Sequence, residues 1–220
     1  MITQFKDYTQ QTPQSQETFD PVQYERRMMV FENYWNDSVF NGFNNQSVKP
    51  FLENIGLMIG EQVTVGHRYI TSKESLSYYL KTPGGVIWDH PETFPITYFG
   101  FHGNHNGFQL PQEGLISKDD ILEMCTGFKD FPTVLYFGSC SLFEDDDQFG
   151  YDVLESSGSC GVLGFKEKIP FNIGMLIDLL FISSFFLFPD GNPFDNLEYL
   201  YSEVIKEFPV SKELGFTLYI

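Results

Sequence analysis

The segment FPITYFGFH (residues 94–102) decides the fold class, because it is an apolar run that stops abruptly at a histidine followed by Gly103. A second apolar run, TVLYFGSC (133–140), stops in the same way at Cys140. Short apolar runs bounded by turn residues are typical of strands that are buried on both faces. Both segments therefore predict strands of a parallel sheet.

Helical patterns alternate with strand-like runs along the rest of the chain. We predict further strands at residues 27–34, 62–70, 160–169 and 213–220, and helices at residues 47–60, 71–81, 117–128, 148–158, 171–188 and 196–208. This alternation favours a mostly parallel sheet that is covered by helices on both faces. The sequence thus predicts a three-layer α/β/α sandwich in one domain, residues 26–220. Residues 1–25 are rich in Gln and Thr, which predicts a flexible or loosely attached arm.

The charge and the composition limit the class of partner and the kind of core that the protein can have. The 220 residues carry a net charge of −17, which repels phosphate backbones and argues against a nucleic-acid partner. The charge fits either a basic peptide or protein partner or solubility alone. With 24 Phe and no alanine, the core is expected to consist largely of aromatic side chains.

The three cysteines, Cys125, Cys140 and Cys160, form no C-x-x-C pair and predict no disulfide framework. We therefore expect a reducing, cytoplasmic setting, and the first residues lack the features of a signal peptide. The apolar segment 171–188 contains one charge, Asp178, and is at the short limit for a membrane span. We expect a helix that lies in the core or in an interface rather than in a membrane.

His102 and Cys140 form the candidate catalytic pair. Ligands of parallel sheets gather at the carboxyl ends of the strands, and both residues end a predicted strand. Neighbouring strands lie about 4.8 Å apart, so the imidazole could activate the thiol as a nucleophile for acyl transfer. Gly103 would let the backbone turn and present an N–H group to an oxyanion, with the Cys140 N–H group as the second donor. Alternatively, His102 is a structural histidine and Cys140 an ordinary buried residue.

A strand ending in His-Gly, followed by a later strand ending in Ser-Cys, resembles the caspase-like cysteine peptidases of the caspase–hemoglobinase fold (clan CD). The segment CGVLGFKEKIPF (160–171) is similar to the strand after the nucleophile in the bacterial CHAT-type branch. The resemblance implies a caspase-like sandwich, a His102 base, a Cys140 nucleophile and no cofactor. It also implies cleavage of a protein partner in a bacterial defence or regulated-proteolysis system, with an activating protein as a further candidate partner.

The loop after Cys140 differs from that of eukaryotic caspases, because it contains acidic residues and no arginine. Glu144, Asp145 and Asp146 would pair with a basic substrate residue, so we expect cleavage after Lys or Arg. Alternatively, this acidic run is a solvated loop. His105 in the sequence HGNH does not complete a metal site. The remaining alternative function is a catalytically silent caspase-like scaffold or protein-interaction module.

Overall fold

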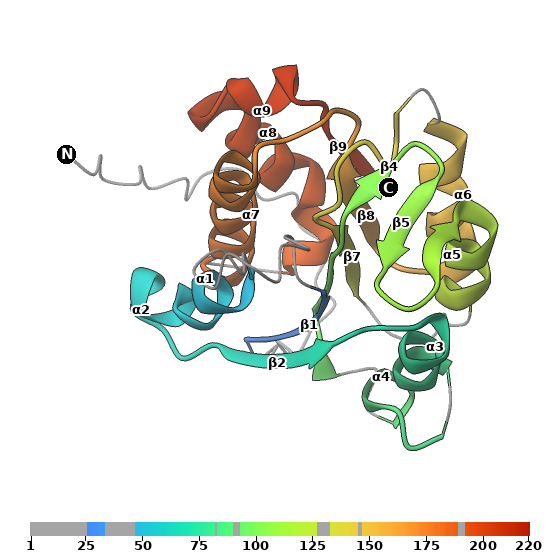
Figure 1. Ribbon diagram of the computed structural model, residues 1–220. Coiled ribbons are helices and arrows are strands. Elements are labelled where there is room, and N and C mark those ends of the chain that lie inside the picture. The colour runs from blue at the N-terminus through green and yellow to red at the C-terminus, as the bar shows by residue number, and fades with distance from the viewer. Residues whose placement is uncertain are drawn as a thin grey trace, which may run out of the picture.

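The computed structural model describes residues 26–33, 47–81, 83–89, 93–126, 133–144, 147–188 and 192–220 (Figure 1). Its centre is a six-stranded sheet in the order β2-β1-β3-β7-β8-β9, in which only the β8–β9 pair is antiparallel. The strands of this sheet are β1 (Arg27–Glu32), β2 (Thr64–Tyr69), β3 (Ile96–Gly100), β7 (Val134–Phe137), β8 (Gly161–Phe165) and β9 (Phe216–Tyr219). The predicted mostly parallel sheet is thus confirmed.

Helices cover both faces of this sheet (Figure 1). On one face lie α1 (Lys49–Glu53), α2 (Ile55–Ile59), α7 (Phe171–Phe186), α8 (Leu197–Glu207) and α9 (Val210–Glu213). A 3-10 turn, η2 (Pro193–Asn196), leads into α8. On the other face lie α3 (Lys73–Lys81), α4 (Val86–Asp89), α5 (Lys118–Cys125) and α6 (Asp147–Ser157). This arrangement confirms the α/β class and is compatible with a three-layer sandwich. The predicted arm, residues 1–25, lies outside the described residues.

Each face of the sheet has its own hydrophobic core, because side chains of a strand alternate between the faces. On the α3–α5–α6 face, the rings of Phe31, Phe99 and Phe137 occupy paired positions on three adjacent strands. Their centroids are 5.9 and 4.8 Å apart, so they stack across the sheet. On the α7 face, Tyr98 and Tyr136 stack in the same way at 5.3 Å. Stacked aromatic rings thus provide the core expected from the composition.

A small antiparallel sheet, which the sequence analysis did not predict, follows β3. It consists of β4 (Gly103–Asn104), β5 (Gly107–Leu110) and β6 (Gly114–Ser117). Gly107 has a φ of 146°, which allows the tight turn between β4 and β5. The small sheet packs its Phe108 ring on Phe101 at 4.6 Å, so it continues the core beyond the end of β3.

Two further expectations need correction. The predicted helix at residues 47–60 is two short helices, because Asn54 has a φ of −91° and a ψ of 0° and interrupts the helical hydrogen bonding between them. The predicted strand at 213–220 begins only at Phe216, because α9 and a left-handed turn at Gly215 precede it. Neither change alters the order of the central strands.

Helix α7 is the most apolar helix, and its inner face is buried against β3, β7 and β9. The Phe181 side chain is fully buried, with its ring 5.8 Å from that of Tyr136 and 6.3 Å from that of Phe216. Among the described residues no helix combines the length and the hydropathy that a membrane span requires. Of the two locations expected for this segment, the structure shows a core helix whose outer face is exposed at Leu176 and Leu180.

The first prediction concerns this core contact. Phe181→Ala should lower the free energy of unfolding by about 3–5 kcal/mol, because it leaves a cavity between α7 and the sheet. Leu180→Ala is the matched control on the same helix and should cost less than about 1 kcal/mol, since Leu180 is 38% exposed. Urea unfolding followed by circular dichroism measures both changes. Equal losses from the two variants would contradict the assigned orientation of α7.

Candidate active site

The ends of β3 and β7 bring the two predicted catalytic residues to the same edge of the sheet. The strands are parallel neighbours, and Phe99 pairs with Phe137. The Gly138 N–H group donates to the Phe99 carbonyl oxygen at 3.0 Å and continues this pairing beyond the strands. His102 and Cys140 each lie three residues past the last paired position. They therefore occupy equivalent positions in the two segments that follow β3 and β7.

Gly103 lies directly against the backbone of Cys140. A methyl group added at Gly103 would be 2.6 Å from the Cys140 carbonyl oxygen and 3.3 Å from the Cys140 nitrogen. It would also be 2.8 Å from Cβ of Ser139. Because a side chain would collide with this backbone, only glycine permits the contact. The chain that follows His102 is thus held next to the predicted nucleophile.

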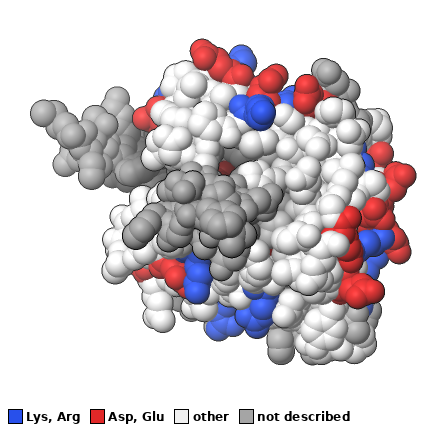
Figure 2. Space-filling view, in the orientation of Figure 1, with Lys and Arg blue, Asp and Glu red and all other residues white. Residues whose placement is uncertain are grey.

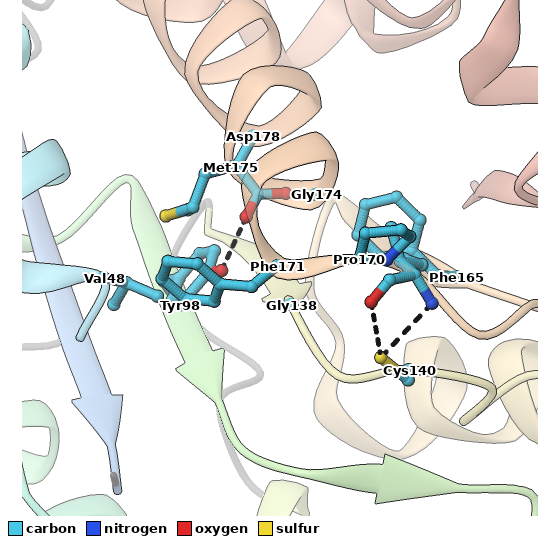
Figure 3. A pocket seen from close by; sticks show the side chains of 11 residues that line it. Val48, Tyr98, Gly138, Cys140, Phe165, Pro170, Phe171, Gly174, Met175 and Asp178 are labelled. Carbon is cyan, nitrogen blue, oxygen red and sulfur yellow. Dashed lines mark hydrogen bonds between the residues drawn. The ribbon is translucent and has the colours of Figure 1, made fainter. Parts of the chain in front are cut away.

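Cys140 is partly buried, and its sulfur faces the loop between β8 and α7. The sulfur is 3.5 Å from both the nitrogen and the carbonyl oxygen of Ile169. Dashed lines at Cys140 in Figure 3 mark these two contacts. The next residue, Ser141, has a φ of 51°. Among the described residues it is the only non-glycine residue with a positive φ. Positive φ at such a residue stores strain and is concentrated at functional sites. The backbone of the turn after Cys140 is therefore strained at Ser141.

The other two cysteines have different surroundings. Cys125 is buried on α5, and burial raises the pKa of its thiol to about 12. Cys160 precedes β8, and its pKa is raised mainly by partial burial. Both shifts favour the unreactive thiol form. Their surroundings are those of structural cysteines.

A small pocket adjoins Cys140 and separates the end of β7 from α7. The walls are formed largely by apolar side chains, namely Val48, Phe165, Ile169, Pro170, Phe171 and Met175. Tyr98 and the carboxyl group of Asp178 lie at the far side from Cys140 in Figure 3. About 20 Å³ is open to water-sized groups, which is room for about one water molecule.

Asp178 projects from α7 into the apolar core and is 2% exposed. Tyr98 and Tyr136 donate hydrogen bonds from their hydroxyl groups to its two carboxyl oxygens, each at 2.6 Å. Burial nevertheless raises the pKa of Asp178 to about 7, because two neutral donors compensate only part of the lost hydration. Burial and the negative charge of Asp178 raise the pKa values of both tyrosines. Sequence analysis recognised Asp178 only as an obstacle to membrane insertion.

Glu32 is a second buried carboxylate at this edge of the sheet. It ends β1 opposite Gly100 and is 2% exposed. Its oxygens accept hydrogen bonds from Ser47 Oγ at 2.5 Å and the Val48 N–H group at 2.9 Å, and lie 2.7 Å from Nε2 of His67. Glu32 thus fastens the start of α1 to the sheet beside the pocket. A glutamate at the end of the apolar run RMMVFE was the available sequence signal.

Two buried oxygens at the same edge have no hydrogen-bond partner within the described part of the chain. They are Oδ1 of Asn33, which follows β1, and Oγ of Ser139, which precedes Cys140. Native proteins satisfy nearly all such groups, and exceptions often belong to functional sites. Both oxygens lie beside the ends of the strands that lead to His102 and Cys140.

The acidic loop after Cys140 is only partly described. Glu144 is half-buried and closes a turn by donating its N–H group to the Ser141 carbonyl oxygen at 3.2 Å. Asp145 and Asp146 lie outside the described residues. Asp147 forms an ion pair with Lys166 at 2.5 Å and accepts a hydrogen bond from Tyr219 at 3.0 Å, and these contacts lower its pKa. The proposed role of Glu144, Asp145 and Asp146 in substrate binding stays a prediction.

The remaining histidine of the HGNH sequence, His105, is exposed in the turn between β4 and β5. Its Nε2 atom is 3.1 Å from Nδ2 of Asn106. Within the described ranges, no three His, Cys, Asp or Glu side chains are grouped closely enough to hold a metal ion.

Comparison with known proteins gives no assignment. No protein-family model matches this sequence, and no curated protein matches it significantly.

The second prediction follows from the buried carboxyl group. The folded protein holds the Asp178 proton more tightly than the unfolded chain does, so stability should fall as the pH rises from about 4 to about 7. Asp178→Asn removes this titration. The variant should match the wild-type protein near pH 4 and exceed its free energy of unfolding by about 1–4 kcal/mol at pH 8.

Urea unfolding at pH 4, 6 and 8 measures this difference. Asp152→Asn, on α6, is the matched control, because Asp152 pairs with Gln148 at an exposed site. A stability difference between Asp178→Asn and the wild-type protein that did not change with pH would contradict the assigned titration.

Proposed function

We propose that the chain is a caspase-like cysteine endopeptidase of the bacterial CHAT-type branch with a Cys140–His102 dyad. The observation that carries this proposal is the close contact between Gly103 and the backbone of Cys140, at the ends of two adjacent parallel strands. That contact holds the residue after His102 against the backbone of Cys140, and nucleophilic acyl transfer would require the imidazole within hydrogen-bond reach of the thiol. The strand context and the six-stranded sheet agree with the resemblance to caspase-like peptidases.

In the proposed reaction, His102 takes the thiol proton and the Cys140 sulfur attacks the carbonyl carbon of the scissile peptide. The N–H groups of Gly103 and Cys140 stabilise the oxyanion of the tetrahedral intermediate. His102 then protonates the leaving amine as the C–N bond breaks, which leaves a thioester on Cys140. Water, deprotonated by His102, hydrolyses the thioester and restores the thiol. Every atom and electron is thus provided by the protein, the peptide and water, without a cofactor.

The proposed substrate is a protein cleaved after a basic residue. Acidic side chains, with a few basic ones among them, gather along the right-hand border of the face shown in Figure 2, and a group of basic side chains lies at its lower edge. The net charge of −17 favours a basic segment over an acidic one. We place the enzyme in the cytoplasm, in a regulated-proteolysis or defence system in which another protein switches it on.

The alternative is a caspase-like scaffold whose dyad is unused. The contacts of the Cys140 sulfur with Ile169 favour this reading, because they direct the thiol into the loop that precedes α7. The two functions differ in one respect: only the enzyme requires a nucleophilic thiol at Cys140.

The third prediction separates the two functions. A peptidyl acyloxymethyl ketone should attach to Cys140, and Cys140→Ala or His102→Ala should reduce cleavage of a peptide library by about 10³-fold or more. Cys160→Ala and His105→Ala are matched controls and should retain activity. Intact-mass spectrometry and peptide mapping locate the label. Label on Cys160 rather than Cys140, or cleavage that survives Cys140→Ala, would contradict the proposed enzyme.

A further inference from the structure

The pocket beside Cys140 contains a buried carboxyl group without a basic partner. None of the residues that line it is Lys, Arg or His. The described partners of Asp178 are the hydroxyl groups of Tyr98 and Tyr136. Buried carboxylates in proteins are normally paired with a cation, because an isolated charge in an apolar interior costs several kcal/mol. Asp178 therefore has no cationic partner among the described residues.

Tyr98 lies near the acidic side chains of this region. Its pKa is raised first by burial and then by the charge of Asp178, with smaller contributions from Glu32 and Cys140. Of the side chains that line the pocket, the Asp178 carboxyl group and the Cys140 thiol are acidic and none is basic. An acidic substrate residue is disfavoured by this potential, and a cationic one is favoured.

Asp178 retains the capacity to bind such a cation. An ionised carboxylate has about four acceptor sites, and the two tyrosines occupy one on each oxygen. The remaining sites can receive further donors from the pocket. A carboxylate that costs stability and nonetheless lines the same pocket as a thiol is typical of a residue kept for function.

The shape of the pocket favours a lysine side chain. The space open to water-sized groups accommodates about one water molecule, which is the size of an ammonium group, and the stem of a substrate lysine enters only when the loop that carries Ile169 moves aside. The apolar side chains of Ile169, Phe171 and Met175 suit the four-carbon stem of a lysine. Met175 is unbranched and adaptable, so its side chain can shift to admit this stem.

We infer that Asp178 is the specificity-determining residue of the enzyme and binds the ammonium group of a substrate lysine that precedes the scissile bond. Tyr98 and Tyr136 are positioning residues that hold the carboxylate toward the pocket. This inference rests on the proposed function of Cys140 and assigns the recognition of the basic residue to the pocket rather than to the loop at 144–147.

The test compares two acyloxymethyl ketone peptides that differ only in the residue next to the reactive group, lysine or norleucine. Norleucine has the stem of lysine without the ammonium group. At pH 8 the lysine peptide should label Cys140 about 10-fold to 100-fold faster, which is the range for a charge-assisted hydrogen bond. This comparison requires no variant and is therefore independent of any folding defect. Equal rates, or a faster norleucine peptide, would overturn the inference.

Asp178→Asn should reduce the ratio of the two rates to less than about threefold, because the neutral amide loses the charge interaction. Gly174→Ala is the matched shape control, since a methyl group there meets Ile169 at 3.6 Å and only narrows the pocket. It should slow both peptides alike. A lysine preference that survives Asp178→Asn would transfer recognition to another residue and overturn the assignment.

A second measurement distinguishes failure of this inference from failure of the proposed function. In the wild-type protein, n-butylamine should slow the alkylation of Cys140 by iodoacetamide more than n-butanol does, and Asp178→Asn should remove the difference. If no peptide ketone labels Cys140, the proposed function fails, and protection by the amine alone would still support a lysine pocket. Equal protection by the amine and the alcohol overturns the pocket whether or not the chain is an enzyme.

Discussion

The hydrogen bonds from Tyr98 and Tyr136 to Asp178 are the interaction on which the site depends. They join the most apolar helix, α7, to β3 and β7, the two strands that lead to His102 and Cys140. A methyl group at Gly138 would lie 2.0 Å from the Tyr98 hydroxyl oxygen, so this network reaches the backbone two residues before Cys140. The position of the thiol and the packing of α7 are therefore coupled through one buried carboxyl group.

The hydrogen bonds to Asp178, which hold α7 on the sheet, also fix the loop between β8 and α7. This loop carries Ile169, which contacts the Cys140 sulfur, and it leads directly into α7. Substrate binding in the pocket would have to replace or shift this contact to free the thiol for attack. A segment that binds in the pocket beside Asp178 would thereby expose the Cys140 thiol. This coupling gives the proposed enzyme a physical basis for activation by its substrate.

The central sheet could be predicted from the sequence because its strands are short apolar runs separated by helical patterns, and this signal does not depend on distant contacts. That the strands ending at His102 and Cys140 are neighbours was only an assumption from the sequence, and the structure shows them paired. The split of the predicted helix at Asn54 could not be read from periodicity, since apolar spacing continues across it. The small sheet after β3 was missed because its strands are short, although Asn106-Gly107 is a known turn signal.

The pocket could not be predicted, because Asp178 lies 80 residues from Tyr98 and 42 from Tyr136, and only the folded sheet brings them together. The role of Glu32 depends on similar long-range contacts with His67 and the start of α1. Local sequence patterns report which side chains can be buried, but the partners of a buried charge are decided by tertiary packing.

The central claim is that His102 activates the thiol of Cys140, and the rate of Cys140 alkylation by iodoacetamide at pH 7 tests it most directly. Cys160 serves as an internal reference in the same peptide digest, because burial raises its pKa and it lies outside the proposed site. The account predicts that Cys140 reacts faster than Cys160 and that His102→Ala slows Cys140 by about tenfold or more without changing Cys160. An unchanged rate at Cys140 in the His102→Ala protein would contradict it.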